Sequence, residues 1–159
     1  MMDIVLTDKA KELGIKPPKQ GTVHSAGFDL QACIDEPIHI FVNEIVKIPT
    51  GIKVWQPNDN HGFSIVGGAL ILPRSSNPDF GGLMQLANTI GLVDEDYQGE
   101  IFVKVWNAMP ERGPVIINPL DRFAQIAFTY FIPQKFRLVE SFDLHTERHE
   151  YGFGSTGKI

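Results

Sequence analysis

The stretch IFVKVW, residues 101–106, carries the clearest structural signal in this chain. Two sets of side chains alternate along it: Ile101, Val103 and Val105, and Phe102, Lys104 and Trp106. Successive side chains of a β-strand point to opposite faces of its sheet, so this period of two indicates a strand with one buried face. We therefore expect a sheet that covers a core on one side.

Glycine and proline interrupt the rest of the chain at short intervals, with 15 Gly and 11 Pro in 159 residues, which leaves little room for long helices. The one helical candidate, Asp8–Leu13, is short. Runs rich in β-branched and aromatic residues predict further strands at Ile4–Leu6, Phe28–Cys33, Ile38–Val42, Ile45–Ile48, Ile52–Trp55, Phe63–Val66, Leu70–Leu72, Val115–Ile117, Phe123–Phe131 and Phe136–Val139. Many short strands predict a single all-β domain, either a sandwich or a closed barrel.

Composition limits the classes of function. A chain of 159 residues fits one domain that buries roughly 70% of its unfolded surface. No apolar run approaches the roughly 18 residues that span a bilayer, so we expect a soluble, cytoplasmic protein without membrane contact. The single Cys33 excludes an intrachain disulfide and suits a reducing compartment. The net charge of -5 argues against DNA or RNA as partners, whereas one nucleotide needs only a few donors.

Two short stretches place polar side chains among apolar neighbours. AGFDL, residues 26–30, contains Asp29, whose alternative interpretation is an exposed aspartate at a strand edge. PRSS, residues 73–76, groups Arg74 with Ser75 and Ser76. A guanidinium binds phosphate through two parallel hydrogen bonds and hydroxyls add donors, so this group suits an anion, although an ordinary surface turn has the same composition.

The stretch NTIGLVDEDYQGEI, residues 88–101, is rich in acidic side chains and lies between two expected strands. Gly91 and Gly99 permit tight backbone geometry there, and an inert acidic hairpin is the alternative. Its acids also match positions 1 and 3 of a calcium-binding EF-hand loop, but Val105 stands where that loop needs a glutamate. A calcium site is therefore excluded.

Two later stretches are less specific. Arg122 and Gln125 interrupt an otherwise apolar strand in RFAQIAF, residues 122–128. His145 and His149 have the spacing of a zinc-binding helix face, but no third ligand completes the set, so we treat them as solvated. GFGSTGKI, residues 152–159, approaches the P-loop pattern, except that Ile159 replaces the required Ser or Thr.

In their order and spacing, AGFDL, PRSS, NTIGLVDEDYQGEI, RFAQIAF and RHEYGFGSTG closely resemble the motifs of the trimeric dUTPases, from Ala26 to Gly157. The resemblance implies an all-β fold of the β-clip or jelly-roll type, with a barrel domain at residues 1–145 and a flexible C-terminal arm at residues 146–159. It also implies a homotrimer that hydrolyses dUTP to dUMP and pyrophosphate with Mg²⁺ as cofactor.

The resemblance assigns roles residue by residue. Asp94 matches the catalytic aspartate that deprotonates a water for attack on the α-phosphorus, and Tyr97 matches the tyrosine that packs on deoxyribose. Asn88 and Gly91 belong to the hairpin that binds uracil. Asp29 matches an acid that contacts the hydration shell of the metal. The residues that match phosphate contacts are Arg74, Ser75, Ser76 and Gln125.

The last motif resembles an arm that closes over the active site of a neighbouring subunit. Phe153 matches the ring that covers uracil, and the residues that match phosphate contacts are Arg148, Gly154, Ser155 and Thr156. His149 and Tyr151 stand where the family usually has glycine, so the arm is strained if either position needs a positive φ.

Two alternatives share the resemblance. The dCTP deaminases have the same fold, but they need a glutamate three residues before the strand-ending Asn107, and this chain has Lys104 there. A dUTP-gated module that regulates a partner protein is the second alternative. Pyrophosphate release from dUTP separates hydrolysis from both.

Overall fold

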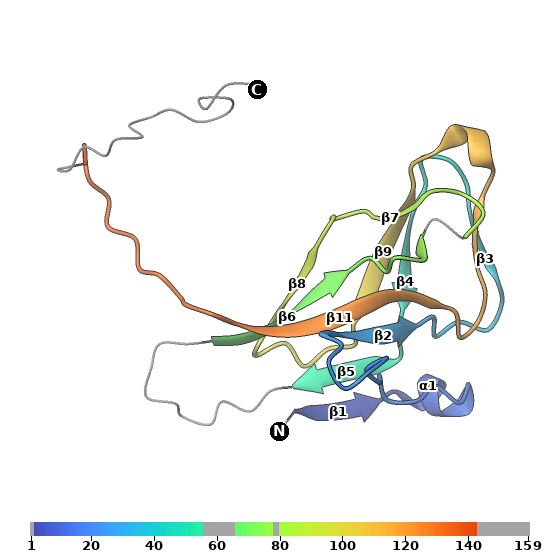
Figure 1. The fold of residues 1–159 in the computed structure, drawn as a ribbon, viewed down its shortest axis with the longest axis horizontal. Coiled ribbons are helices and arrows are strands. Elements are labelled where there is room, and N and C mark those ends of the chain that lie inside the picture. The colour runs from blue at the N-terminus through green and yellow to red at the C-terminus, as the bar shows by residue number, and fades with distance from the viewer. Residues whose placement is uncertain (1, 56–65, 78–79, 143–159) are drawn as a thin grey trace.

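The computed structural model describes residues 2–55, 66–77 and 80–142, which form short strands around one core (Figure 1). In chain order the elements are β1 (Asp3–Leu6), α1 (Asp8–Glu12), β2 (Gly27–Gln31), β3 (Ile38–Ile40), β4 (Ile45–Pro49), β5 (Ile52–Trp55), β6 (Val66–Leu72), β7 (Met84–Leu86), β8 (Gly91–Asp94), β9 (Phe102–Asn107), a 3-10 turn (Pro110–Arg112), β10 (Val115–Ile117) and β11 (Arg122–Phe131).

The strands form four antiparallel sheets. Their orders are β1–β5, β10–β3, β2–β11–β6–β8 and β4–β9–β7. β11 is the longest strand and holds β2 on one side and β6 on the other. The all-β jelly-roll prediction is confirmed. The candidate residues Asp29, Gln125 and Asp94 lie on β2, β11 and β8 of the same four-stranded sheet.

One hydrophobic core lies between the sheets. Its fully buried members come from several strands and include Leu30, Ile40, Ile48, Val103, Phe123 and Ile126. A small second cluster joins Ala10 of α1 to Cys33 and Ile15. The helix begins after Thr7, whose Oγ1 accepts a hydrogen bond from the Ala10 N–H at 3.2 Å. In the described ranges, no helix has both the length and the apolar character that a bilayer crossing requires.

The alternating pattern predicts most of these strands correctly. Ile52–Trp55 and Val115–Ile117 are strands as expected, and β9 starts one residue later than expected, with Val103 and Val105 buried and Lys104 exposed. The stretch Leu70–Leu72 is the end of a longer β6, while residues 63–65 lie outside the described residues. The sequence pattern does not predict β7 and β8. Asp94 is therefore the last residue of a strand, whereas the pattern places it in a loop between strands.

The predicted strand at Phe136–Val139 is wrong. Residues 132–142 continue from β11 away from the domain (Figure 1) and form no strand. The side chains of Phe136 and Leu138 are 97% and 99% exposed. The β-propensity of this stretch is real, but propensity produces a strand only where a neighbouring strand supplies hydrogen bonds.

Candidate functional site

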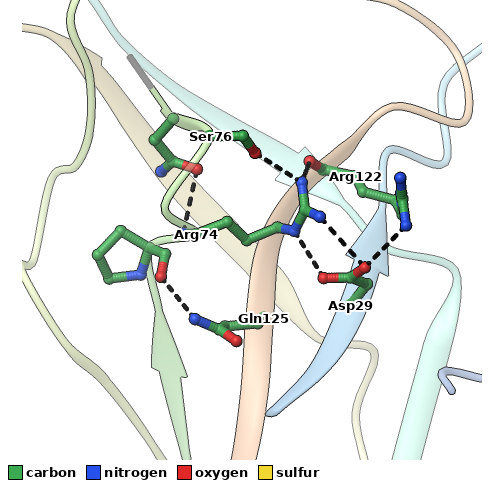
Figure 2. Close-up of polar contacts among 7 residues, drawn as sticks. Asp29, Arg74, Ser76, Arg122 and Gln125 are labelled. Atoms are coloured by element: carbon green, nitrogen blue, oxygen red, sulfur yellow. Dashed lines mark hydrogen bonds and ion pairs between the residues drawn. The ribbon is translucent and has the colours of Figure 1, made fainter. Parts of the chain in front are cut away.

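Asp29 on β2 lies between two arginine side chains beyond the end of β6 (Figure 2). Arg74 donates to it twice, from Nε to Oδ1 at 2.6 Å and from Nη2 to Oδ2 at 3.2 Å. Arg122 donates from Nη1 to Oδ2 at 3.2 Å. The side chains of Asp29 and Arg74 are only 29% and 20% exposed, so this two-pronged ion pair is better shielded from solvent than a surface pair.

Protein contacts fix the remaining directions of Arg74. Its Nη1 donates to Ser76 Oγ and to the Arg122 carbonyl, each at 2.8 Å (Figure 2). In the backbone of the turn, Arg74 N donates to Asn77 Oδ1 and Asn77 N donates to the Arg74 carbonyl, both at 3.1 Å. The buried Asn77, which the motif does not indicate, therefore holds the turn that presents the exposed Ser75.

A β-bulge brings Arg122 and Gln125 to the same side of β11. The register with β2 shifts between Arg122 and Ala124, so that Phe123 and Ala124 are both buried. Strict alternation would place residues three apart on opposite faces, and the extra residue of a bulge removes this restriction. The sequence marks Arg122 only as a charge in an apolar strand, and nothing in its spacing indicates the pairing with Asp29.

The position of the Gln125 amide depends on the absence of a side chain at Gly27. Its Cα is paired with Asp29 of β2 and with Leu72 of β6, and its Nε2 donates to the Pro73 carbonyl at 2.8 Å. A Cβ on Gly27 would lie 3.1 Å from Gln125 Cδ and closer still to Oε1. With two guanidinium groups, one carboxylate and nearby hydroxyl and amide groups, this phosphate-side group has a net positive charge and suits an anion.

Asp94 and Tyr97 lie apart from these residues, at the end of β8 and in the turn that follows it. Asp94 ends β8, is opposite Gly68 of β6, and has an exposed side chain beside a small pocket. The Tyr97 N–H donates to the Asp94 carbonyl at 3.2 Å and closes a turn. Tyr97 Oη donates to the Glu100 carbonyl at 2.8 Å. A Cβ on Gly99 would lie 2.6 Å from Tyr97 Cζ, so glycine there is what lets the ring lie across the turn.

Gly91 is the first residue of β8, and Asn88 lies three residues before it. Thr89 between them has φ 57°, and the Ile90 N–H donates to the Asn88 carbonyl at 2.6 Å. A Cβ on Gly91 would lie 3.0 Å from Ile71 Cβ and 3.4 Å from Asn88 Nδ2. The positive φ of a non-glycine residue marks a tightly constrained turn. Asn88 is thus held close to the bare backbone of Gly91.

The candidate residues form two groups that one chain does not bring together. The phosphate-side group is Asp29, Arg74, Ser75, Ser76, Arg122 and Gln125, and the hairpin group is Asn88, Gly91, Asp94 and Tyr97. Asp94 is opposite Gly68, whereas Gln125 is opposite Leu72 on the same strand, β6. At about 3.3 Å per residue, four steps along a strand separate these positions by roughly 13 Å. The carboxylate of the hairpin group and the donors of the phosphate-side group therefore face different ends of β6.

The remaining predicted residues lie outside the described part of the chain. They are Arg148, Phe153, Gly154, Ser155 and Thr156, together with His145, His149 and Tyr151. Within residues 2–55, 66–77 and 80–142, no three acidic, His or Cys side chains are grouped to hold a metal ion. Asp29 has three of its about four lone-pair sites engaged by the two arginines, which leaves one site, on Oδ1. One site is enough for contact with a metal-bound water, and it excludes bidentate ligation of a metal by this carboxylate.

Comparison with known proteins adds independent evidence. A family model described as dUTPase matches residues 14–157. The deoxyuridine 5'-triphosphate nucleotidohydrolase of Sodalis glossinidius is 43% identical over 143 residues, covering 89% of this chain and 87% of that protein. The protein of the same name from Buchnera aphidicola strain APS is 36% identical over 156 residues, covering 98% and 95%.

Solved structures show the same fold. The dUTPase of Streptococcus mutans is 27% identical with a TM-score of 0.65, covering 85% of this chain and 98% of that chain. The dUTPase of Staphylococcus bacteriophage 80alpha with dUPNHPP has a TM-score of 0.79 at 21% identity, covering 99% of both chains. At that identity the second match bears on the fold alone.

Proposed function

The chain belongs to the dUTPase family and is a dUTP diphosphatase, and from this premise we propose how its residues divide the hydrolysis of dUTP to dUMP and pyrophosphate. One observation carries the proposal: the candidate base and the candidate phosphate donors stand at opposite ends of one strand. We infer that they serve one substrate from two chains.

Asp94 is the general base. Its carboxylate is exposed, while its backbone is held by pairing with β6 and by the turn to Tyr97. It accepts a proton as the water oxygen bonds to the α-phosphorus, and the bond from this phosphorus to the oxygen bridging to the β-phosphate breaks, releasing pyrophosphate. A positioned base of this kind contributes about 10²- to 10⁴-fold in rate.

The phosphate-side group binds the triphosphate. Arg74 spends four of its five N–H donors on Asp29, Ser76 and the Arg122 carbonyl, so it mainly holds the turn in shape. The Arg122 side chain is 62% exposed, and within the described residues its guanidinium donates one hydrogen bond, at 3.2 Å to Asp29. We assign the direct cationic contact to Arg122, together with Ser75, Ser76 and Gln125 as neutral donors.

The hairpin recognises the nucleoside. Asn88 and the bare backbone at Gly91 offer an amide and main-chain groups to the edge of uracil, and the ring of Tyr97, which is 44% exposed, offers an apolar face to deoxyribose. A polar cleft of this kind rejects a wrong base mainly because its own groups are then left unpaired.

A homotrimer supplies the second chain. Each chain gives its hairpin group to one site and its phosphate-side group to another, which a closed ring of identical subunits satisfies. The exposed apolar side chains after β11, such as Phe136, Leu138 and Phe142, support contact with another copy, because they find little burial in their own chain. The arm at residues 146–159, beyond a domain of residues 1–145, would then close a neighbour's site through Arg148, Phe153, Gly154, Ser155 and Thr156.

Magnesium fits this arrangement as a companion of the substrate. The triphosphate would supply most of its ligands, and Asp29 would contact its hydration shell through the remaining site on Oδ1. When bound, the ion neutralises charge on the phosphate oxygens.

We propose the cytoplasm as the compartment of this protein. Its one cysteine, Cys33, is buried and free, which suits a reducing compartment.

The substrate panel is the test of this function. The purified protein with Mg²⁺ should release pyrophosphate from dUTP and far more slowly from dCTP, dTTP and UTP. Deamination is disfavoured because Lys104 occupies the position at which the dCTP deaminases need a glutamate. Lys104 is paired with Lys47 on the neighbouring strand. Ammonia from dCTP, or no release from any nucleotide, would contradict the proposal.

A further inference from the structure

Glu95 reaches from the hairpin back to β6. Its Oε2 accepts a hydrogen bond from the Gly67 N–H at 2.7 Å, in a partly buried position. Glu95 follows Asp94 directly, and Gly67 precedes Gly68, the partner of Asp94. This bond therefore lies one step beyond the last paired residues of β6 and β8.

The bond replaces a missing backbone contact. The register pairs Val93 with Ala69 and Asp94 with Gly68, so its next step would oppose Glu95 to Gly67. The strand ends before that step, because the chain turns and the Tyr97 N–H bonds to the Asp94 carbonyl. The Gly67 N–H would lose its partner where β8 leaves the sheet, and the Glu95 carboxylate supplies one.

A glycine, Gly68, stands opposite the last residue of β8. Gly68 offers no side chain toward Asp94, and a Cβ there would lie 2.8 Å from the Phe131 ring and 3.1 Å from the Val93 carbonyl. The last residue of a strand opens more readily than the middle unless its neighbours are hydrogen-bonded. The direction of the Asp94 carboxylate thus depends on the hydrogen bond between Glu95 and Gly67, one register step beyond the Asp94–Gly68 pair.

We propose that Glu95 is a positioning residue for Asp94: by bonding the Gly67 N–H, it holds the end of β8 closed and keeps the Asp94 carboxylate directed at the attacking water. This proposal rests on the assignment of Asp94 as the base. A misplacement of about 1 Å at a reacting group can cost up to 10²-fold in rate, so a single well-placed bond is sufficient to matter.

Three variants separate reach from charge. Glu95→Gln loses the charge but keeps an acceptor oxygen at the same distance from the backbone. Glu95→Asp keeps the charge but is one methylene, about 1.5 Å, too short. Glu95→Ala loses both. If Glu95→Ala does not fold, the Gln and Asp variants still distinguish an effect of side-chain reach from an effect of charge.

The readouts are kcat and KM for dUTP, the melting temperature, and hydrogen exchange of the Gly67 amide by NMR. We expect Glu95→Gln to stay within about 3-fold of the wild-type kcat, and Glu95→Asp and Glu95→Ala to fall by about 10- to 100-fold with KM little changed. Gly67 exchange should accelerate in the two impaired variants only. A purely structural role would lower the melting temperature and leave kcat per folded site unchanged.

Other results would overturn the proposal. A wild-type kcat in Glu95→Ala would show that the bond does not position the base, and a Glu95→Gln loss equal to that of Glu95→Ala would show that charge matters instead. Asp94→Asn is measured in parallel: if it remains active, the role of Asp94 fails and the proposal with it. Slow Gly67 exchange in Glu95→Ala would contradict the bond itself, whatever Asp94 does.

Discussion

Asp94 and Gln125 flank the same strand from opposite sides and at opposite ends: Asp94 is opposite Gly68 and Gln125 is opposite Leu72 of β6. The strand is rigidly paired on both edges, so no local motion within one chain closes a separation of about 13 Å. In the proposed mechanism, proton transfer and phosphate binding therefore belong to different surfaces of the domain. Changes at the two ends should have different kinetic signatures.

Asp94→Asn should lower kcat by at least about 10²-fold, because an amide cannot accept the proton of the attacking water. Binding of dUTP should persist, since the amide retains nearly the same shape. The measurement is single-turnover hydrolysis together with calorimetric binding of dUTP. A rate close to wild type would remove Asp94 from the mechanism.

Arg74→Lys should weaken the site although it preserves the charge. An ammonium group cannot reproduce the two parallel bonds to Asp29 while also reaching Ser76 and the Arg122 carbonyl. We expect kcat/KM to fall at least about 10-fold and the free energy of unfolding to drop by about 1–3 kcal/mol.

Arg112→Lys is the matched control for that variant. Arg112 lies exposed in the 3-10 turn and takes part in none of the hydrogen bonds or ion pairs that join Asp29, Arg74 and Arg122, so the same substitution there should leave kinetics and stability unchanged. Equal behaviour of the two variants would show that the fork geometry of Arg74 is irrelevant.

Gly27→Ala should impair catalysis through Gln125. The new methyl would lie 3.1 Å from Gln125 Cδ and would push its amide off the Pro73 carbonyl. We expect KM for dUTP to rise several-fold. Gly21→Ala is the control, because a Cβ there meets only Ser25 Oγ at an ordinary 3.5 Å. Unchanged kinetics in Gly27→Ala would show that Gln125 does not need its present position.

Alternation and motif order predict much of this molecule, but not the contacts between its strands. The strand at residues 101–106 follows from its period of two, since one face is buried. β8 was missed because four residues that begin with glycine have weak intrinsic preference, and it exists through pairing with β6. The bulge at Phe123 and the Glu95 bond depend on register, which a local pattern does not contain.

Gly51→Ala checks the packing of α1 on the domain. Gly51 has φ 73°, and a Cβ would lie 2.5 Å from Ala10 Cβ of α1 and 2.8 Å from Cys33 Sγ, so strain and overpacking should together lower the free energy of unfolding by about 2–4 kcal/mol. Gly14→Ala has nearly the same φ, 74°, with no described atom within 4 Å of the new Cβ. It should cost only about 1–2 kcal/mol, from strain alone. Equal losses in chemical denaturation would mean that Cys33 does not confine Gly51.

Mixing two inactive chains examines the shared site. One chain carries Asp94→Asn, and the other carries Arg122→Ala with Gln125→Ala, which leaves the Asp29–Arg74 pair in place. After random exchange in equal amounts, verified by native mass spectrometry, roughly a quarter of the sites in a ring should combine an intact Asp94 with an intact phosphate-side group from another chain. We predict that dUTP hydrolysis rises to about this fraction of the wild-type rate. Mixed oligomers that stay as inactive as their parents would contradict a site built from two chains.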